Sequence, residues 1–135
     1  TSIQQLLEAL KNKDASIRYW AATGIGNIGA PAKRMRKRVA QCFDDPSPSV
    51  RIAAARAVAK LGAPGDALPV LEAELQSDHQ WGRLAAAIVL DEMDDKARPA
   101  LPFLQQALLN QPNKYIVRVA NRAINELENT DHQVP

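Results

Sequence analysis

The sequence has little of what most catalytic and metal sites are built from. Its 135 residues include one cysteine, Cys42, and two histidines, His79 and His132, which lie far apart. A single cysteine excludes an internal disulfide and a cysteine-based metal cluster, and the histidines do not form a ligand-spaced pair. No Ser/His/Asp, Cys/His or paired-carboxylate arrangement indicates a catalytic site. We therefore expect a chain that is not an enzyme and that uses no cofactor or metal.

Aromatic residues and long apolar runs are also scarce. Aromatics make up 4% of the sequence, whereas 46% is hydrophobic and much of that is alanine and leucine. This composition is typical of closely packed helices. No run approaches the roughly 18 apolar residues of a membrane span, and no basic-then-apolar signal opens the chain. Because the sequence begins at Thr1 rather than Met, we expect a fragment or a processed product, so the missing signal does not define the compartment.

One stretch, residues 50–62, has a clear helical pattern. Its apolar residues recur at i, i+4, i+7, i+8 and i+11, and they are Val50, Ala54, Ala57, Val58 and Leu61. This spacing places them on one face of a helix. We expect Ser49 to cap the beginning of the helix and Gly62 to end it in a left-handed conformation.

The same helix occurs four times. The copies begin at Ile17, Val50, Gly82 and Ile116, so the steps are 33, 32 and 34 residues. We predict that these helices span residues 16–28, 49–61, 81–93 and 115–127. Neither these helices nor the shorter ones before them bury their apolar face alone, so the pairs must stack.

A shorter helix is predicted before each copy. Its apolar residues are Ile3, Leu6, Leu7 and Leu10 in the first pair, Met35, Val39, Cys42 and Phe43 in the second, Leu68, Leu71 and Leu75 in the third, and Leu101, Leu104 and Leu108 in the fourth. The most buried positions should be Ile25, Ile28, Val58, Leu61, Val89, Leu90 and Ile124, with Leu7, Leu10, Leu71 and Leu104 facing them. Cys42 is expected to be a buried structural thiol.

The pattern resembles a HEAT-type repeat. Pro69 and Pro102 lie inside first helices, where that family often places a proline, and Asp45 precedes Arg51 by six residues, a family pairing that orders the turn. The resemblance implies an all-α, right-handed α-solenoid of four helix pairs. Its repeats would cover about residues 1–30, 31–63, 64–96 and 97–129, followed by a frayed tail at 130–135.

Three phrases, at residues 45–55, 96–102 and 113–123, resemble the C-terminal HEAT segment of some bacterial sulfatases. The sulfatase signature, Cys (or Ser)-x-Pro-x-Arg, is absent, because Cys42 is followed by Phe43, Asp44 and Asp45. The resemblance implies a non-catalytic interaction scaffold whose partner is the catalytic domain of its own parent chain. Such a parent would be periplasmic or secreted, and without this relationship the chain would be cytoplasmic.

Four aromatic residues at the starts of the second helices are candidate binding residues: Tyr19, Trp20, Trp81 and Tyr115. They can stack on a sugar, a base or a partner side chain. Alternatively, each fills a gap between neighbouring repeats.

A basic segment gives a second candidate surface: Lys33, Arg34, Arg36, Lys37 and Arg38. Residues 1–60 contain 11 basic and 4 acidic residues, net +7, whereas residues 61–135 contain 6 and 11, net −5. The segment is either a solvated face or a site of weak, salt-sensitive polyanion binding without sequence specificity, since no aromatic is interleaved with the cations.

A series of arginines, Arg18, Arg51, Arg83 and Arg118, also repeats. We expect a structural ladder with turn acids such as Asp14, Asp45 and Asp78, and an anion-binding row is the alternative. The alternative function for the whole chain is nucleic-acid binding, as in the HEAT-like DNA glycosylases, whose chemistry would require a carboxylate beside the aromatics on the inner face.

Overall fold

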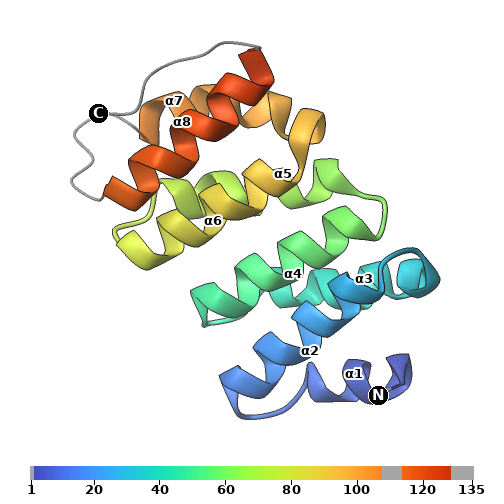
Figure 1. Cartoon of the computed structure of the whole chain (residues 1–135). Coiled ribbons are helices and arrows are strands. Elements are labelled where there is room, and N and C mark those ends of the chain that lie inside the picture. Colours follow the sequence, from blue (N-terminus) through green and yellow to red (C-terminus); the bar gives the residue numbers. More distant parts are fainter. Residues whose placement is uncertain (1, 108–113, 129–135) are drawn as a thin grey trace. The chain divides into compact units, whose positions relative to one another are not determined.

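The structure is a computed structural model that describes residues 2–107 and 114–128. Every regular element within these residues is a helix, and they contain no strand (Figure 1). The chain divides into two compact units, which we call unit 1 (Thr1–Val70) and unit 2 (Leu71–Pro135). The predicted all-α class is therefore confirmed. None of the described helices has the length and apolar character that a membrane span requires.

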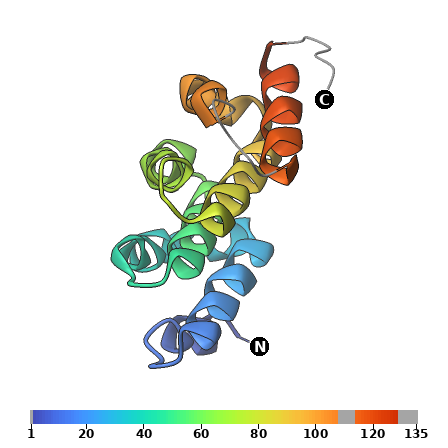
Figure 2. The same cartoon turned by 90° about the vertical axis from the view of Figure 1, so that its left-hand side faces the viewer.

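Unit 1 is built from two layers of helices. Its elements are α1 (Ile3–Ala9), α2 (Ala15–Ile28), the 3₁₀ helix η1 (Ala30–Met35), α3 (Arg36–Ala40), the 3₁₀ helix η2 (Gln41–Asp44) and α4 (Pro48–Lys60). Helix α2 packs along α4, and α1 and α3 form the second layer behind them (Figure 2). The buried side chains of both layers form one hydrophobic core.

Unit 2 repeats this arrangement. Helix α5 (Pro64–Leu75) crosses the boundary between the units and is followed by α6 (Gln80–Glu92), the 3₁₀ helix η3 (Asp94–Ala100), α7 (Leu101–Ala107) and α8 (Lys114–Glu128). Helix α6 packs along α8, and α7 packs on α8 from the other layer.

The four predicted second helices are α2, α4, α6 and α8, and each begins and ends within one residue of its predicted bounds. The prediction that Ser49 caps α4 is wrong. Ser47 holds that position, and the helix begins at Pro48, whose fixed φ suits the first helical residue. At the other end Gly62 has a φ of 102°, so the predicted glycine stop is confirmed.

The predicted first helix of the second pair is broken into three short pieces, η1, α3 and η2. A physical cause is charge repulsion. Five like charges within six residues repel one another along a single helix. Only Val39 and Cys42 are buried, whereas Met35 and Phe43 are partly buried. The segment is therefore held by fewer apolar contacts than a leucine-rich helix would be.

The predicted core is largely confirmed. The predicted core residues are buried, except Ile28, which is only partly buried at the last position of α2. There the chain turns at Gly29, whose φ is 70°, so the last side chain leaves the packed face. Cys42 is buried and free, as predicted. Leu108 lies outside the described residues.

Small residues allow α2 and α4 to approach closely. A Cβ at Gly26 would lie 3.2 Å from the Ala57 Cα and 3.3 Å from the Ala57 Cβ. A Cβ at Gly24 would instead meet the Leu6 side chain of α1 at 3.3 Å. Gly26, rather than Gly24, is thus the glycine that lets one long helix pack on the next.

Candidate interaction surfaces

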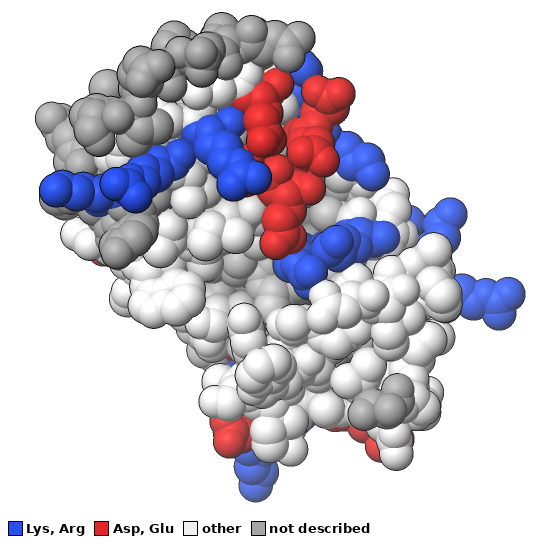
Figure 3. All heavy atoms as spheres, in the orientation of Figure 1, with Lys and Arg blue, Asp and Glu red and all other residues white. Residues whose placement is uncertain are grey.

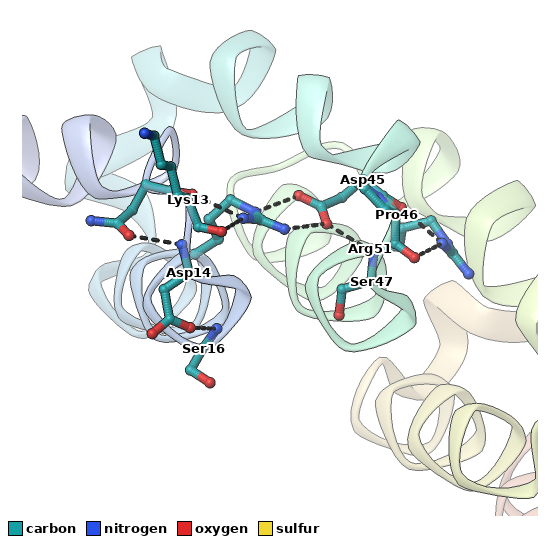
Figure 4. A network of polar contacts seen from close by, with 9 residues as sticks. Lys13, Asp14, Ser16, Asp45, Pro46, Ser47 and Arg51 are labelled. Carbon is teal, nitrogen blue, oxygen red and sulfur yellow. Dashed lines mark hydrogen bonds and ion pairs between the residues drawn. The ribbon is translucent and has the colours of Figure 1, made fainter.

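The turn before α4 is organised by an ion pair between the first two helix pairs. Arg18, on α2, donates from Nε and Nη2 to the Asp45 carboxylate at 2.8 and 3.0 Å. Its Nη1 donates to the carbonyl oxygens of Asn12 and Lys13 at 2.9 and 3.0 Å (Figure 4). One guanidinium therefore donates hydrogen bonds both to the turn before α2 and to the turn before α4, which confirms the structural ladder for Arg18.

Arg51 contacts the same turn through main-chain oxygens. Its Nη1 donates to the main-chain carbonyls of Asp45 at 2.8 Å and Pro46 at 3.3 Å, while the Asp45 carboxylate also accepts from the Ser47 N–H at 2.9 Å. Burial alone would raise the pKa of the Asp45 carboxyl. The hydrogen bonds from Arg18 and Ser47 and the charges of Arg18 and Arg51 outweigh it, so the pKa lies below its usual value.

Among the described residues of unit 2, the ladder does not continue in the same form. The Nε atom of Arg83, on α6, is buried without a hydrogen-bond partner. Arg118 is exposed on α8. The sequence pattern does not distinguish these two arginines from Arg18 and Arg51. The acid that pairs with Arg18 lies in the turn of the next helix pair, and a match between arginine positions does not show whether such an acid is present. The turn after Arg83 contains no acid in residues 108–113.

A charged cluster that the sequence did not reveal lies between α6 and α8. Asp91 Oδ2 is 3.3 Å from Nε of Arg122, which also lies 3.5 Å from Glu126. Burial, and then the negative charge of Glu126, raise the pKa of the Asp91 carboxyl, although Arg122 opposes them. The other Asp91 oxygen, Oδ1, is buried without a hydrogen-bond partner. Helix periodicity alone does not show that these groups from different pairs meet.

Two of the candidate aromatics are strongly exposed. The exposed fraction is 67% for Trp20 and 75% for Trp81, and Tyr19 packs edge-to-face on Trp20 with ring centroids 5.7 Å apart. Neither tryptophan therefore fills a gap in its own unit. The side chain of Tyr115 lies outside the described residues.

The exposure of Trp20 is part of a difference between α2 and α4. Val50, Ala53 and Ala57 share a face of α4, because they lie three and four residues apart, and Ala57 packs on Gly26 of α2. Val50 is fully buried and Ala53 is 6% exposed. The matching positions on α2 hold Ile17, which is 41% exposed, and Trp20. The face that is buried on α4 is therefore exposed to solvent on α2, and its residues there are apolar.

The basic segment lies on η1 and α3 and is divided between two hollows. The larger, of about 560 Å³, is lined by Ala30, Pro31, Lys33, Arg34, Arg36 and Lys37. Arg38 instead lines a hollow of about 160 Å³ that includes Asp45 and Cys42. Lysine and arginine side chains project from this edge of unit 1 (Figure 3). The structure thus brings four of the five predicted cations together.

The described residues contain no group of three or more His, Cys, Asp and Glu side chains placed to hold a metal ion. His79 is exposed at the beginning of α6, and His132 lies outside the described residues. Burial raises the pKa of the Cys42 thiol, which disfavours the reactive thiolate.

A family model of HEAT repeats matches residues 35–125. The chain belongs to the HEAT-repeat family. Together with the helix order, this match confirms the predicted α-solenoid fold class. A search of curated proteins found no match.

Two solved structures share the fold of this HEAT-repeat chain. One is an engineered protein, with a TM-score of 0.67 and 19% identity over 94% of this chain and 62% of the other. The second is the complex of CpcE and CpcF of phycocyanin lyase from Nostoc sp. PCC7120, with a TM-score of 0.60 and 21% identity over 96% of this chain and 66% of the other. The chain thus spans somewhat less than two thirds of the length of each.

Proposed function

We propose that this chain is a non-catalytic protein-interaction module, and that it serves as an accessory domain of a sulfatase-type hydrolase. The observation that carries the proposal is the open apolar face of α2, formed by Ile17 and Trp20. An exposed tryptophan beside an exposed isoleucine is typical of residues that dominate protein interfaces, since both lose apolar surface to water on binding.

The neighbouring helix supports this interpretation. On α4 the matching residues, Val50 and Ala53, are buried on the face that packs on α2. Ile17 and Trp20 of α2 are apolar in the same way, but they are exposed. On the face of the molecule shown in Figure 3, few charged side chains lie over α2, whereas acidic side chains gather over unit 2. An uncharged face of this kind suits a protein surface better than a nucleic acid.

The last helix offers no comparable face. The positions of α8 that match Ile52, Ala55 and Ala59 of α4 hold Arg118, Asn121 and Asn125. On α4 all three are buried apolar residues. The proposed contact therefore belongs to the first repeat, and its occupant is the catalytic domain of the parent chain, as the sulfatase resemblance implies. Such a parent would act in the periplasm or outside the cell.

The complete reading frame of the gene provides the first test. A Cys-x-Pro-x-Arg or Ser-x-Pro-x-Arg motif upstream of residue 1 supports the sulfatase parent. A frame without that motif rejects the parent, and measurable sulfate-ester hydrolysis by the isolated chain rejects the non-catalytic role.

The contact itself is tested with the two domains expressed as separate chains. We expect Ile17→Ser combined with Trp20→Ser to weaken their binding by tenfold or more, on the order of 1.4 kcal/mol. The matched control is Ile88→Ser combined with Trp81→Ser, because Ile88 is 42% exposed and Trp81 is exposed, both on α6. Equal losses from both double variants would contradict a site on α2.

A further inference from the structure

The larger hollow of unit 1 has an unusual lining. Four of its six lining residues are cations, Lys33, Arg34, Arg36 and Lys37, and the other two are Ala30 and Pro31. The lining contains no carboxylate and no aromatic ring. The positive charge facing this space is therefore not neutralised from within it.

The surrounding chain does not neutralise these cations either. Within the described residues, ion pairs form at other arginines, such as Arg18, Arg98 and Arg122. The next acids along the chain are Asp44 and Asp45. The Asp45 carboxylate already accepts two hydrogen bonds from Arg18. Four neighbouring like charges raise the energy of the folded chain, and a bound anion would relieve that cost.

The fold fixes part of the wall of the hollow. Arg36 is partly buried at the beginning of α3, so its side chain is more restricted than those of its exposed neighbours. Lys33 crosses the end of α4: its Cε would lie 3.7 Å from a Cβ at Gly62. Lys33 and Arg34 lie on η1 and Arg36 and Lys37 on α3, so the lining comes from both pieces of the segment.

The lining restricts the ligand class. Two guanidinium groups suit tetrahedral oxyanions, because each presents paired N–H donors, and the two lysines add point charges. The lining has no aromatic ring to stack on a base and no side chain that can accept a hydrogen bond from a sugar. We propose that this hollow binds a short linear polyanion that carries several phosphate or sulfate groups. The proposal is independent of the protein contact on α2.

The test compares two short probes by isothermal titration calorimetry at low salt: tripolyphosphate and a heparin-derived tetrasaccharide. Tighter binding of one identifies a phosphate or a sulfate ligand, and equal binding means that only oxyanion charge is recognised. Binding of both probes should weaken as the salt concentration rises, because exposed charges are screened. If neither probe binds at low salt, the proposal is overturned.

The segment provides a matched control variant. Changing Lys33, Arg34, Arg36 and Lys37 to Gln should weaken binding of the better probe by about tenfold or more, since each exposed pair contributes modestly. Arg38→Gln removes a cation from the same segment but from the other hollow. We expect it to leave the affinity unchanged within the error of the titration, because a tenfold loss shared by four cations would be about 1.8-fold for each. An equal effect per charge at both places would show a diffuse basic surface and contradict the site.

A second measurement requires no substitution. Acetylation of lysine side chains, read by mass spectrometry, should slow at Lys33 and Lys37 when tripolyphosphate is present. Lys13, which is exposed in another turn, should react at an unchanged rate. Uniform protection of all three lysines, or of none, would overturn the proposal even if the fourfold variant failed to fold.

Discussion

At the scale of single residues, Asp45 has the most consequential environment. Its carboxylate is largely buried and accepts hydrogen bonds from Arg18 on the preceding pair and from Ser47 in its own turn. We expect Asp45→Ala to lower the free energy of unfolding by about 2 kcal/mol, because hydrogen bonds to a charged group are lost. Urea unfolding measures the change. Asp44→Ala, on an exposed neighbour, is the control and should have little effect.

The low pKa of Asp45 has a consequence for pH. The folded-state pKa lies below the unfolded value, so the stabilisation is complete above about pH 4, the unfolded pKa, and is lost as pH falls through the folded pKa. The stability of wild type should therefore fall more steeply below pH 4 than that of Asp45→Asn. Parallel acid-dependence curves for the two proteins would contradict the role given to this carboxylate.

Asp91 should behave in the opposite way. Burial and the charge of Glu126 raise its pKa, so the ionised form destabilises the fold at neutral pH. We expect Asp91→Asn to stabilise the chain at pH 7, by about 1 kcal/mol or less. The difference should shrink as the pH falls through the folded pKa of Asp91 and vanish below about pH 4. Thermal melts across this range measure it, and a destabilised variant at pH 7 would disprove the account.

At the scale of helices, α2 and α4 depend on one small residue. Gly26→Ala should destabilise the chain, because the new Cβ meets the backbone of Ala57, which cannot move without shifting α4. Gly24→Ala should be neutral or stabilise by up to about 1 kcal/mol, since it improves helix propensity and only the flexible Leu6 side chain must yield. If the two substitutions have the same effect in urea unfolding, helix propensity rather than packing controls both.

The helix scale also shows what the sequence could predict. Period-3.6 patterns placed the four long helices within one residue, because their apolar faces are strong and glycine or proline marks several ends. The prediction for residues 30–44 was wrong, since the segment has too few apolar residues to overcome the repulsion of its charges. The arginines were recognised as structural, but Asp45 bonds Arg18 of the preceding pair. Contacts between pairs leave no local pattern in the sequence.

At the scale of the whole molecule, charge is separated along the chain. Residues 1–60 carry net +7 and residues 61–135 net −5, although the total is only +2. We expect the protein to bind both cation- and anion-exchange resins at pH 7 in low salt, because each resin responds to a local surface. Both interactions should be lost near physiological salt, where screening acts over about 8 Å. Binding to the cation exchanger alone would contradict the charge separation.

The bond between Arg18 and Asp45 also determines how such a chain can be lengthened or shortened. It joins two successive helix pairs, so a cut in the linker at residue 30 separates the partners. Removing residues 31–63, a whole pair of 33 residues, would bring Asp78 to the position that Asp45 held, so Arg18 would again face an acid. A duplicated pair likewise brings its own copy of Asp45 to each new junction. Adding or removing a whole pair therefore keeps an acid for Arg18, whereas a cut within a pair does not, which favours change of the array by whole pairs.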